Sequence, residues 1–155
     1  MTTFRAVIVG AGIAGVNAVA GMRSAGFDGE ILLIGDEPEL PYRRPPVSKE
    51  IIRGDKTADQ IRIKPETWYA DNAVELLTGT LVTAIDPSSR EVALDKGAPI
   101  SFDRLLLATG GIARTLRASD GQSASGVRTL RTLADVPKLQ GQLTPGQHLI
   151  VVAPA

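Results

Sequence analysis

The sequence of 155 residues predicts an α/β fold built on a parallel sheet, and three observations support that prediction. An apolar strand at residues 5–10 leads into a glycine-rich turn and then into a helix at residues 13–25 with many small side chains. A second apolar strand follows at residues 31–34 and ends close to an acid, Asp36. Strand, helix and strand in this order predict a right-handed crossover between parallel strands.

The turn after the first strand has the spacing Gly-x-Gly-x-x-Gly, at Gly10, Gly12 and Gly15. In such a turn the first glycine permits the bend, the second lets the backbone approach a pyrophosphate, and the third lets the helix pack on the strand. Free amides at the helix start then attract phosphate oxygens. Asp36 follows about 20 residues later, where a carboxylate accepts hydrogen bonds from a ribose. The pattern predicts a dinucleotide site; the alternative is a glycine-rich turn in an ordinary crossover.

Composition excludes several classes of function. Seventeen basic and seventeen acidic side chains cancel, so nothing favours binding to nucleic acid or to an anionic membrane. Cysteine is absent, which excludes disulfides, thiolate nucleophiles and cysteine metal sites. The one histidine, His148, lies in an apolar run and is predicted to be a strand residue, so no metal site is expected. Since no apolar run has the length of a signal peptide or a membrane span, a cytoplasmic location is expected.

The middle of the chain predicts a loop, two helices and a small antiparallel sheet. Proline density between Glu37 and Val47 predicts a rigid, non-helical loop. Ser48 is expected to cap a short helix that runs through Ile52. A further helix is expected at residues 65–72 and a strand at 74–77, and three alternating segments, 81–85, 91–94 and 99–102, predict an antiparallel meander.

The last third of the chain predicts two buried strands and one helix. Residues 105–108 form an apolar run that ends at Thr109, Gly110 and Gly111. A loop at 112–128, a helix at 133–143 and a buried strand at 149–152 complete the expected elements.

Two further motifs suit a ligand site. Pro45 and Pro46 stiffen the segment before Lys49, which would hold this lysine at a fixed height above whatever the glycine loop binds. The alternative is a solvated loop with an incidental lysine, and the residues alone leave both open. Thr109 and Gly110 follow a strand and have no bulky side chains, as at the ligand edge of open α/β sheets, although this motif taken alone favours a strand followed by a flexible turn.

In order and spacing these motifs resemble the FAD domain of the oxygenase-coupled, NADH-dependent ferredoxin reductases, the family of putidaredoxin and rhodocoxin reductases. The resemblance covers nearly the whole chain, and its most specific part is the proline and lysine block. The matching residues are the glycine loop, Gly35-Asp36-Glu37-Pro38, Leu40-Pro41-Tyr42, Arg44-Pro45-Pro46, Ser48-Lys49, Leu107-Ala108-Thr109-Gly110-Gly111 and Leu130-Arg131-Thr132-Leu133.

The resemblance implies a Rossmann-like three-layer fold for FAD and NAD(P) with an antiparallel meander. It implies an oxidoreductase in which NADH reduces FAD and a [2Fe–2S] ferredoxin takes the electrons, because the chain lacks the cysteine pair of the related disulfide reductases. The implied cofactor contacts are Gly10, Gly12, Ala14, Gly15, Asp36, Arg44, Pro46, Lys49, Val82, Ala108, Thr109, Gly110 and Arg131.

Five of these residues have specific implied roles. Ala14 would contact the pyrophosphate and Asp36 the ribose. Lys49 would be the catalytic residue beside the isoalloxazine. Val82 would offer its backbone to the adenine side, and Arg131 would reach the phosphates or the flavin edge.

The chain departs from the family at its end. Family members continue from a strand like 149–152 into a second glycine loop, whereas here Ala153, Pro154 and Ala155 follow. We therefore expect an incomplete fold, with FAD-binding residues 1–146 and the first strand of an NADH domain in 147–155. The isolated chain is expected to be inactive and prone to self-association. The alternatives are a non-catalytic remnant that binds nucleotide weakly, and the FAD domain of a flavin monooxygenase, against which the proline and lysine block argues.

Overall fold

The computed structural model describes residues 4–117, 119, 122 and 125–152. The chain divides into two compact units, and the first contains residues 1–43 and 58–112. The second contains residues 44–57 and 113–155. No helix of the described residues is long and apolar enough to cross a membrane.

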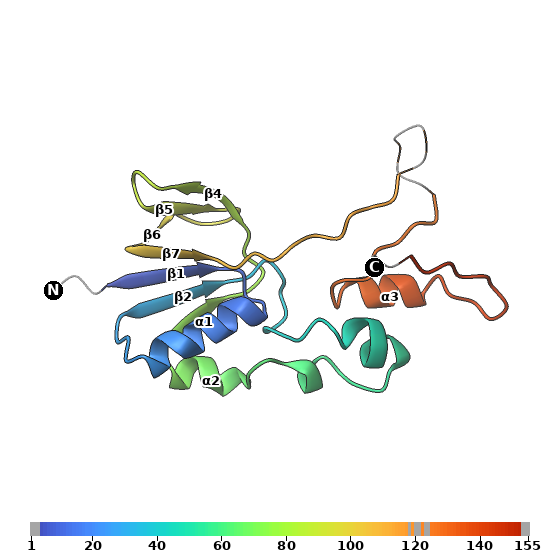
Figure 1. Cartoon of the computed structure of the whole chain (residues 1–155), viewed down its shortest axis with the longest axis horizontal. Coiled ribbons are helices and arrows are strands. Elements are labelled where there is room, and N and C mark those ends of the chain that lie inside the picture. Colours follow the sequence, from blue (N-terminus) through green and yellow to red (C-terminus); the bar gives the residue numbers. More distant parts are fainter. Residues whose placement is uncertain (1–3, 118, 120–121, 123–124, 153–155) are drawn as a thin grey trace. The chain divides into compact units, whose positions relative to one another are not determined.

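The first unit is built on a parallel sheet of four strands in the order β3-β2-β1-β7 (Figure 1). These strands are β1 (Arg5–Val9), β2 (Glu30–Ile34), β3 (Val74–Leu77) and β7 (Arg104–Leu107). Helix α1 (Ile13–Ser24) connects β1 to β2, and α2 (Glu66–Asp71) precedes β3. The predicted crossover and parallel sheet are confirmed.

Alternate side chains of the central strands face two different layers, as the period of two in a strand requires. Ile8 and Leu33 pack with Val16 and Val19 of α1 and with Tyr69 of α2. On the opposite face, four residues of β1 and β2 pack against Val92 of the antiparallel sheet; they are Val7, Val9, Leu32 and Ile34. The fold is therefore three-layered, with helices, a parallel sheet and a meander in that order.

The antiparallel meander forms as expected. Its strands are β4 (Val82–Asp86), β5 (Glu91–Leu94) and β6 (Ile100–Ser101), in the order β4-β5-β6. Val92 of β5 is fully buried and attaches the meander to the parallel sheet. A 3-10 turn at Asp59–Ile61 precedes α2.

The second unit contains two short helical segments. A π-helix spans Val47–Ile51, and α3 spans Asp135–Gln140. The Gln140 side-chain amide donates to the Ile52 carbonyl at 2.8 Å, which joins the two segments. Residues far apart in the sequence thus form one unit.

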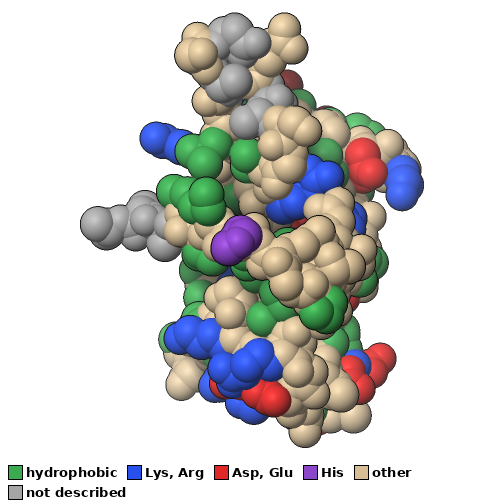
Figure 2. Space-filling view, turned by 90° about the vertical axis from the view of Figure 1, so that its right-hand side faces the viewer, with side chains coloured by type: hydrophobic (Ala, Val, Ile, Leu, Met, Phe, Trp, Pro, Cys, Tyr) green, Lys and Arg blue, Asp and Glu red, His purple; other side chains and the backbone are tan. Residues whose placement is uncertain are grey.

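Several expectations are wrong. The strand expected to be buried at 105–108 forms as β7, but most of its side chains are exposed. Ser48 is not a cap, because Pro46 itself has the helical φ of −67° and is the N-cap of the π-helix. The helix expected at 133–143 is shorter, since the 132–134 turn precedes its start at Asp135. Residues 149–152, expected to be a buried strand, are exposed and pair with no described strand; His148 is also exposed, and Figure 2 shows the histidine on the surface. Residues 153–155 lie outside the described part.

Candidate functional site

Two of the three loop glycines are required by the fold itself. Gly10 has φ +112°, and a Cβ added there would lie 2.2 Å from the Ala108 carbonyl oxygen. A Cβ added at Gly15 would lie 2.0 Å from the Gly10 carbonyl oxygen. No real Cβ contact is this short, so any side chain at either position would displace backbone.

The remaining loop glycine has no such structural reason. Gly12 has the ordinary φ of −82°, and a Cβ there would meet no atom within 4 Å. Gly12 is the N-cap of α1, which has no side-chain cap and no acid in its first turn. Ala14 in that turn is exposed. The helix start therefore presents unpaired amides to open space, as an anion site requires.

Asp36 lies at the same edge of the sheet as the glycine loop. The Gly10 amide donates to the carbonyl of Ile34, the last residue of β2, at 2.8 Å. The Gly35 amide donates to Leu77 at the end of β3, also at 2.8 Å. A Cβ at Gly35 would lie 2.7 Å from the Ala11 Cβ, so this glycine lets the chain before Asp36 pass close to the loop. The Asp36 side chain is exposed.

Gly35 is a site residue to which the sequence analysis gave no role. Its signal in the sequence was a glycine directly between a buried strand and the candidate ribose acid. The contact that explains it is with Ala11, which is distant in the sequence.

The end of β7 also meets the glycine loop. The Ala108 amide donates to the Val9 carbonyl at 2.7 Å, and the Ala108 carbonyl lies where a Gly10 side chain would otherwise be. Thr109 and Gly110 follow as exposed residues, with φ +67° at Gly110. The structure therefore brings Gly10, Gly12, Asp36 and Thr109 to the carboxyl edge of one sheet, where open α/β folds bind ligands.

Val82, the expected adenine contact, lies elsewhere in this unit. Val82 is the first residue of β4 and pairs with Leu94. Its half-buried side chain packs against the core between the two sheets. The side chain therefore has a packing role, and its backbone contact with a ligand stays a prediction.

The predicted residues of the second unit form a separate group. The Arg44 guanidinium donates to the Arg131 carbonyl at 3.3 Å, so these two expected cofactor contacts lie together. Lys49 is exposed on the π-helix, where the amides of Lys49 and Ile51 both donate to the Pro46 carbonyl at 3.0 Å. Rare π-type turns of this kind occur frequently at functional sites.

Glu50 neighbours Lys49 and is ionised. Its own backbone amide, and then its hydrogen bond from Lys56 at 3.3 Å, lower the pKa of this carboxyl. Lys56 is thus paired with Glu50. The Lys49 ammonium has no ion pair among the residues that the structure describes.

The backbone around Arg131 is fixed by Asp135, a residue that the sequence analysis missed. Asp135 Oδ2 accepts hydrogen bonds from the Arg131 amide at 3.0 Å and the Thr132 amide at 2.9 Å. Burial raises the pKa of this carboxyl, but the two amides and the Lys138 charge outweigh burial, and the pKa lies below its ordinary value. The signal in the sequence was an aspartate just before an apolar helical run.

The described residues contain no group of three His, Asp or Glu side chains that could hold a metal ion. The donors at the sheet edge are backbone amides and one carboxylate, a set that suits phosphates and a ribose hydroxyl. The open position at Gly12 is the feature that fits a bound pyrophosphate.

The sequence matches the family model of the pyridine nucleotide-disulphide oxidoreductases over residues 4–152. The chain belongs to this family. Its members bind FAD and NADH.

The chain is 40% identical to putidaredoxin reductase of Pseudomonas putida over 148 residues, which cover 94% of this chain and 35% of the relative. It is also 40% identical, over 145 residues, to the ferredoxin–NAD(+) reductase component of the biphenyl dioxygenase system of Paraburkholderia xenovorans, with coverage of 94% and 35%.

Among solved structures, the covalent putidaredoxin reductase–putidaredoxin complex matches with a TM-score of 0.80 and 38% identity, over 92% of this chain and 34% of that chain. The chain is therefore homologous to the FAD domain of reductases from oxygenase systems, and it spans about 35% of the length of these curated relatives.

Proposed function

We propose that this chain binds FAD and forms the FAD-binding part of an NAD(P)H-dependent ferredoxin reductase. The observation that supports the proposal is Gly12, a glycine that the fold does not need, at the uncapped start of α1. The names of two relatives state ferredoxin–NAD(+) reductase or putidaredoxin reductase activity for those proteins.

In this proposal the first unit holds the adenosine and pyrophosphate. The α1 amides, with Ala14 beside them, donate to phosphate oxygens, and the open space at Gly12 lets those oxygens approach the backbone. The Asp36 carboxylate accepts from the ribose hydroxyls. Thr109 and Gly110 line the same sheet edge without bulky side chains.

The resemblance to the reductase family assigns further cofactor contacts to residues that lie in the second unit. Arg44 and Arg131 offer guanidinium groups to phosphate oxygens or to the flavin edge, and Pro46 shapes the turn that presents Lys49. The Lys49 ammonium acts as the catalytic residue because its positive charge favours negative charge on a reduced flavin.

When bound, FAD would take a hydride from NADH and release single electrons to a [2Fe–2S] ferredoxin. The chain contains no cysteine, so a dithiol route within it does not compete with that transfer. The residues of this chain bind and orient the cofactor and supply the Lys49 charge.

Asp36→Ala tests the assignment of FAD. Loss of the charge-assisted hydrogen bond to ribose should weaken FAD binding by about 1.5–3 kcal/mol, and FMN, which has no adenosine, should bind unchanged. Titration calorimetry with both flavins measures the two affinities. Equal losses for FAD and FMN would show that Asp36 acts on folding alone and would remove the ribose assignment.

A further inference from the structure

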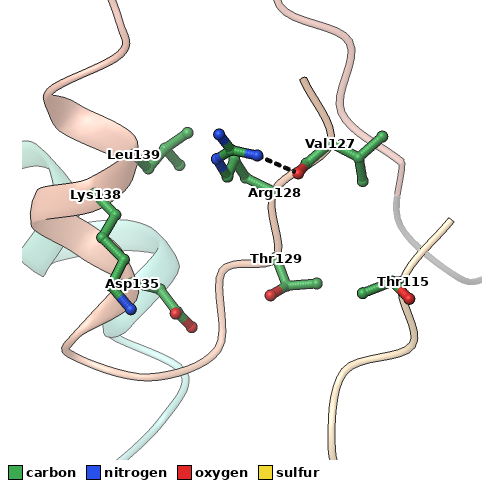
Figure 3. A pocket seen from close by; sticks show the side chains of 7 residues that line it. All are labelled: Thr115, Val127, Arg128, Thr129, Asp135, Lys138 and Leu139. Atoms are coloured by element: carbon green, nitrogen blue, oxygen red, sulfur yellow. Dashed lines mark hydrogen bonds between the residues drawn. The ribbon is translucent and has the colours of Figure 1, made fainter. Parts of the chain in front are cut away.

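A pocket of about 240 Å³ lies wholly within the second unit. One wall is α3, with Asp135, Lys138 and Leu139, and the other is the extended segment Val127, Arg128 and Thr129. Figure 3 shows that the Arg128 side chain extends from its segment toward α3, that the Thr129 hydroxyl lies on the α3 side, and that the methyl groups of Thr129 and Thr115 face each other. No residue of the glycine loop lines this pocket.

The pocket contains hydrogen-bond donors that the protein leaves mostly unused. Arg128 makes one hydrogen bond, from Nη1 to the carbonyl of its neighbour Val127 at 2.9 Å, which leaves most of its five N–H groups free. Lys138 has neither a hydrogen bond nor an ion pair within the described part of the chain, although its charge helps to lower the pKa of Asp135. The Thr115 and Thr129 hydroxyls likewise have no partner among these residues.

The one acid of the pocket does not neutralise these donors. Asp135 Oδ2 already accepts two backbone amides, so this oxygen is oriented toward the 131–132 backbone. Two cations face one carboxylate, and the pocket keeps a net positive charge. The whole second unit has nine basic and four acidic side chains, a formal charge of +5.

We propose that this pocket binds a phosphoryl oxyanion. The two cations, Arg128 and Lys138, come from opposite walls of the pocket, and their combined charge suits a phosphoryl group, which carries up to two negative charges, better than a carboxylate, which carries one. Val127 and Leu139 add apolar surface beside Arg128, and the volume leaves room for a group attached to the phosphate. The ligand is therefore a phosphate or a phosphate monoester, bound independently of the FAD proposed at the glycine loop.

The test is a binding titration of the 155-residue chain, monitored by NMR through the chemical shifts of the backbone amides. Inorganic phosphate and phenyl phosphate are the two probes. The ionic strength is kept constant, and a titration with sodium chloride alone is the control. We expect saturable shifts at Thr129, Asp135 and Lys138, and tighter binding of phenyl phosphate if the natural ligand is a monoester. Equal affinity for the two probes would identify free phosphate as the ligand.

Arg128→Gln and Lys138→Gln should each weaken binding about tenfold, the effect of one charge-assisted hydrogen bond. Arg53→Gln is the matched control, because Arg53 is an exposed cation of the same unit whose charge is paired with Asp55 at 2.7 Å. Circular dichroism confirms that each variant folds.

Absence of saturable shifts, identical shifts with chloride, or an equal loss in Arg53→Gln would overturn the proposal. A Gly12→Val chain that no longer binds FAD but still binds phosphate would separate the two sites.

Discussion

Glycine occurs in the loop of the first unit, and at Gly35 beside it, for two different physical reasons. At Gly10, Gly15 and Gly35 a Cβ would collide with protein atoms at 2.2, 2.0 and 2.7 Å, so folding alone explains these glycines. At Gly12 no protein atom lies within 4 Å. The protein therefore leaves room for a Cβ at Gly12, and within a phosphate-binding pattern a ligand that approaches the backbone explains the glycine there.

Tyr69 shows a different residue-scale effect. Its ring is buried in the core beside α1, its hydroxyl has no hydrogen-bond partner among the described residues, and burial raises the pKa of the phenol to about 12. Tyr69→Phe removes an unpaired polar group and should leave the free energy of unfolding unchanged or raise it by about 1–3 kcal/mol. Urea denaturation at pH 7 measures this change.

Tyr42→Phe is the control, because the Tyr42 hydroxyl donates to Glu37 and its loss should cost about 1 kcal/mol. In the wild type, the free energy of unfolding should fall as the pH rises from 10.0, where an ordinary tyrosine ionises, toward 12. In this range the Tyr69 phenol ionises in the unfolded chain but stays protonated in the folded chain. Tyr69→Phe should flatten this decline. A Tyr69→Phe chain that is less stable at pH 7 would indicate a partner for the hydroxyl.

At the scale of elements, Asp135 is the first residue of α3 and holds the segment that contains Arg131 through two backbone amides. Asp135→Ala removes the acceptor of two backbone amides and should lower the free energy of unfolding by about 1 kcal/mol at pH 7. Because the folded-state pKa of Asp135 lies below 3.8, its contribution is present above that pH and is lost as the pH falls further.

Thermal unfolding of wild type and variant at several pH values measures this effect. The difference between the two chains should shrink as the pH falls below 3.8. A difference that stays constant in acid would show that packing, and not the charged carboxylate, stabilises the turn.

Most elements of the first unit were predictable because their signals are local. Apolar runs bounded by glycine mark β1 and β2, and alternation marks the meander. Residues 149–152 have the same apolar pattern but form no strand, because a strand needs a neighbour with which to pair and pattern alone does not supply one.

For the candidate site, too, the residues with local sequence signals were predictable and those that act through tertiary contacts were not. The glycine loop and Asp36 have fixed spacings, so the sequence was sufficient to find them. Gly35 and Asp135 act through a contact with Ala11 and through amides at a turn, and such geometry appears only after folding. The side-by-side position of Arg44 and Arg131 is likewise a tertiary contact.

At the scale of the whole molecule, the neutral total charge conceals an asymmetry. The first unit has eight basic and thirteen acidic side chains, a formal charge of −5, and the second unit has +5. The two units of different copies therefore attract each other at low ionic strength, and salt should weaken that attraction.

The parallel sheet also ends in an open apolar edge. Among the described strands β7 has a single neighbour, and Leu106 and Leu107 on it are 42% and 57% exposed. We expect the 155-residue chain to self-associate through this edge, as unprotected edge strands do. Sedimentation equilibrium should show weaker association for Leu107→Lys than for wild type, even at high salt.

Leu81→Lys is the control, because Leu81 is similarly exposed, at 51%, but lies just before β4 of the other sheet. Association that disappears in high salt would assign it to the charge asymmetry instead of to β7.

The central claim is that the glycine loop binds the pyrophosphate of FAD, and FAD titration of Gly12→Val beside Gly21→Val tests it most directly. Both glycines lie at or within α1, and a Cβ at either position meets no atom within 4 Å, so both variants should fold. We predict that Gly12→Val abolishes FAD binding and that Gly21→Val leaves it unchanged. Unchanged FAD affinity in a folded Gly12→Val chain would contradict the account.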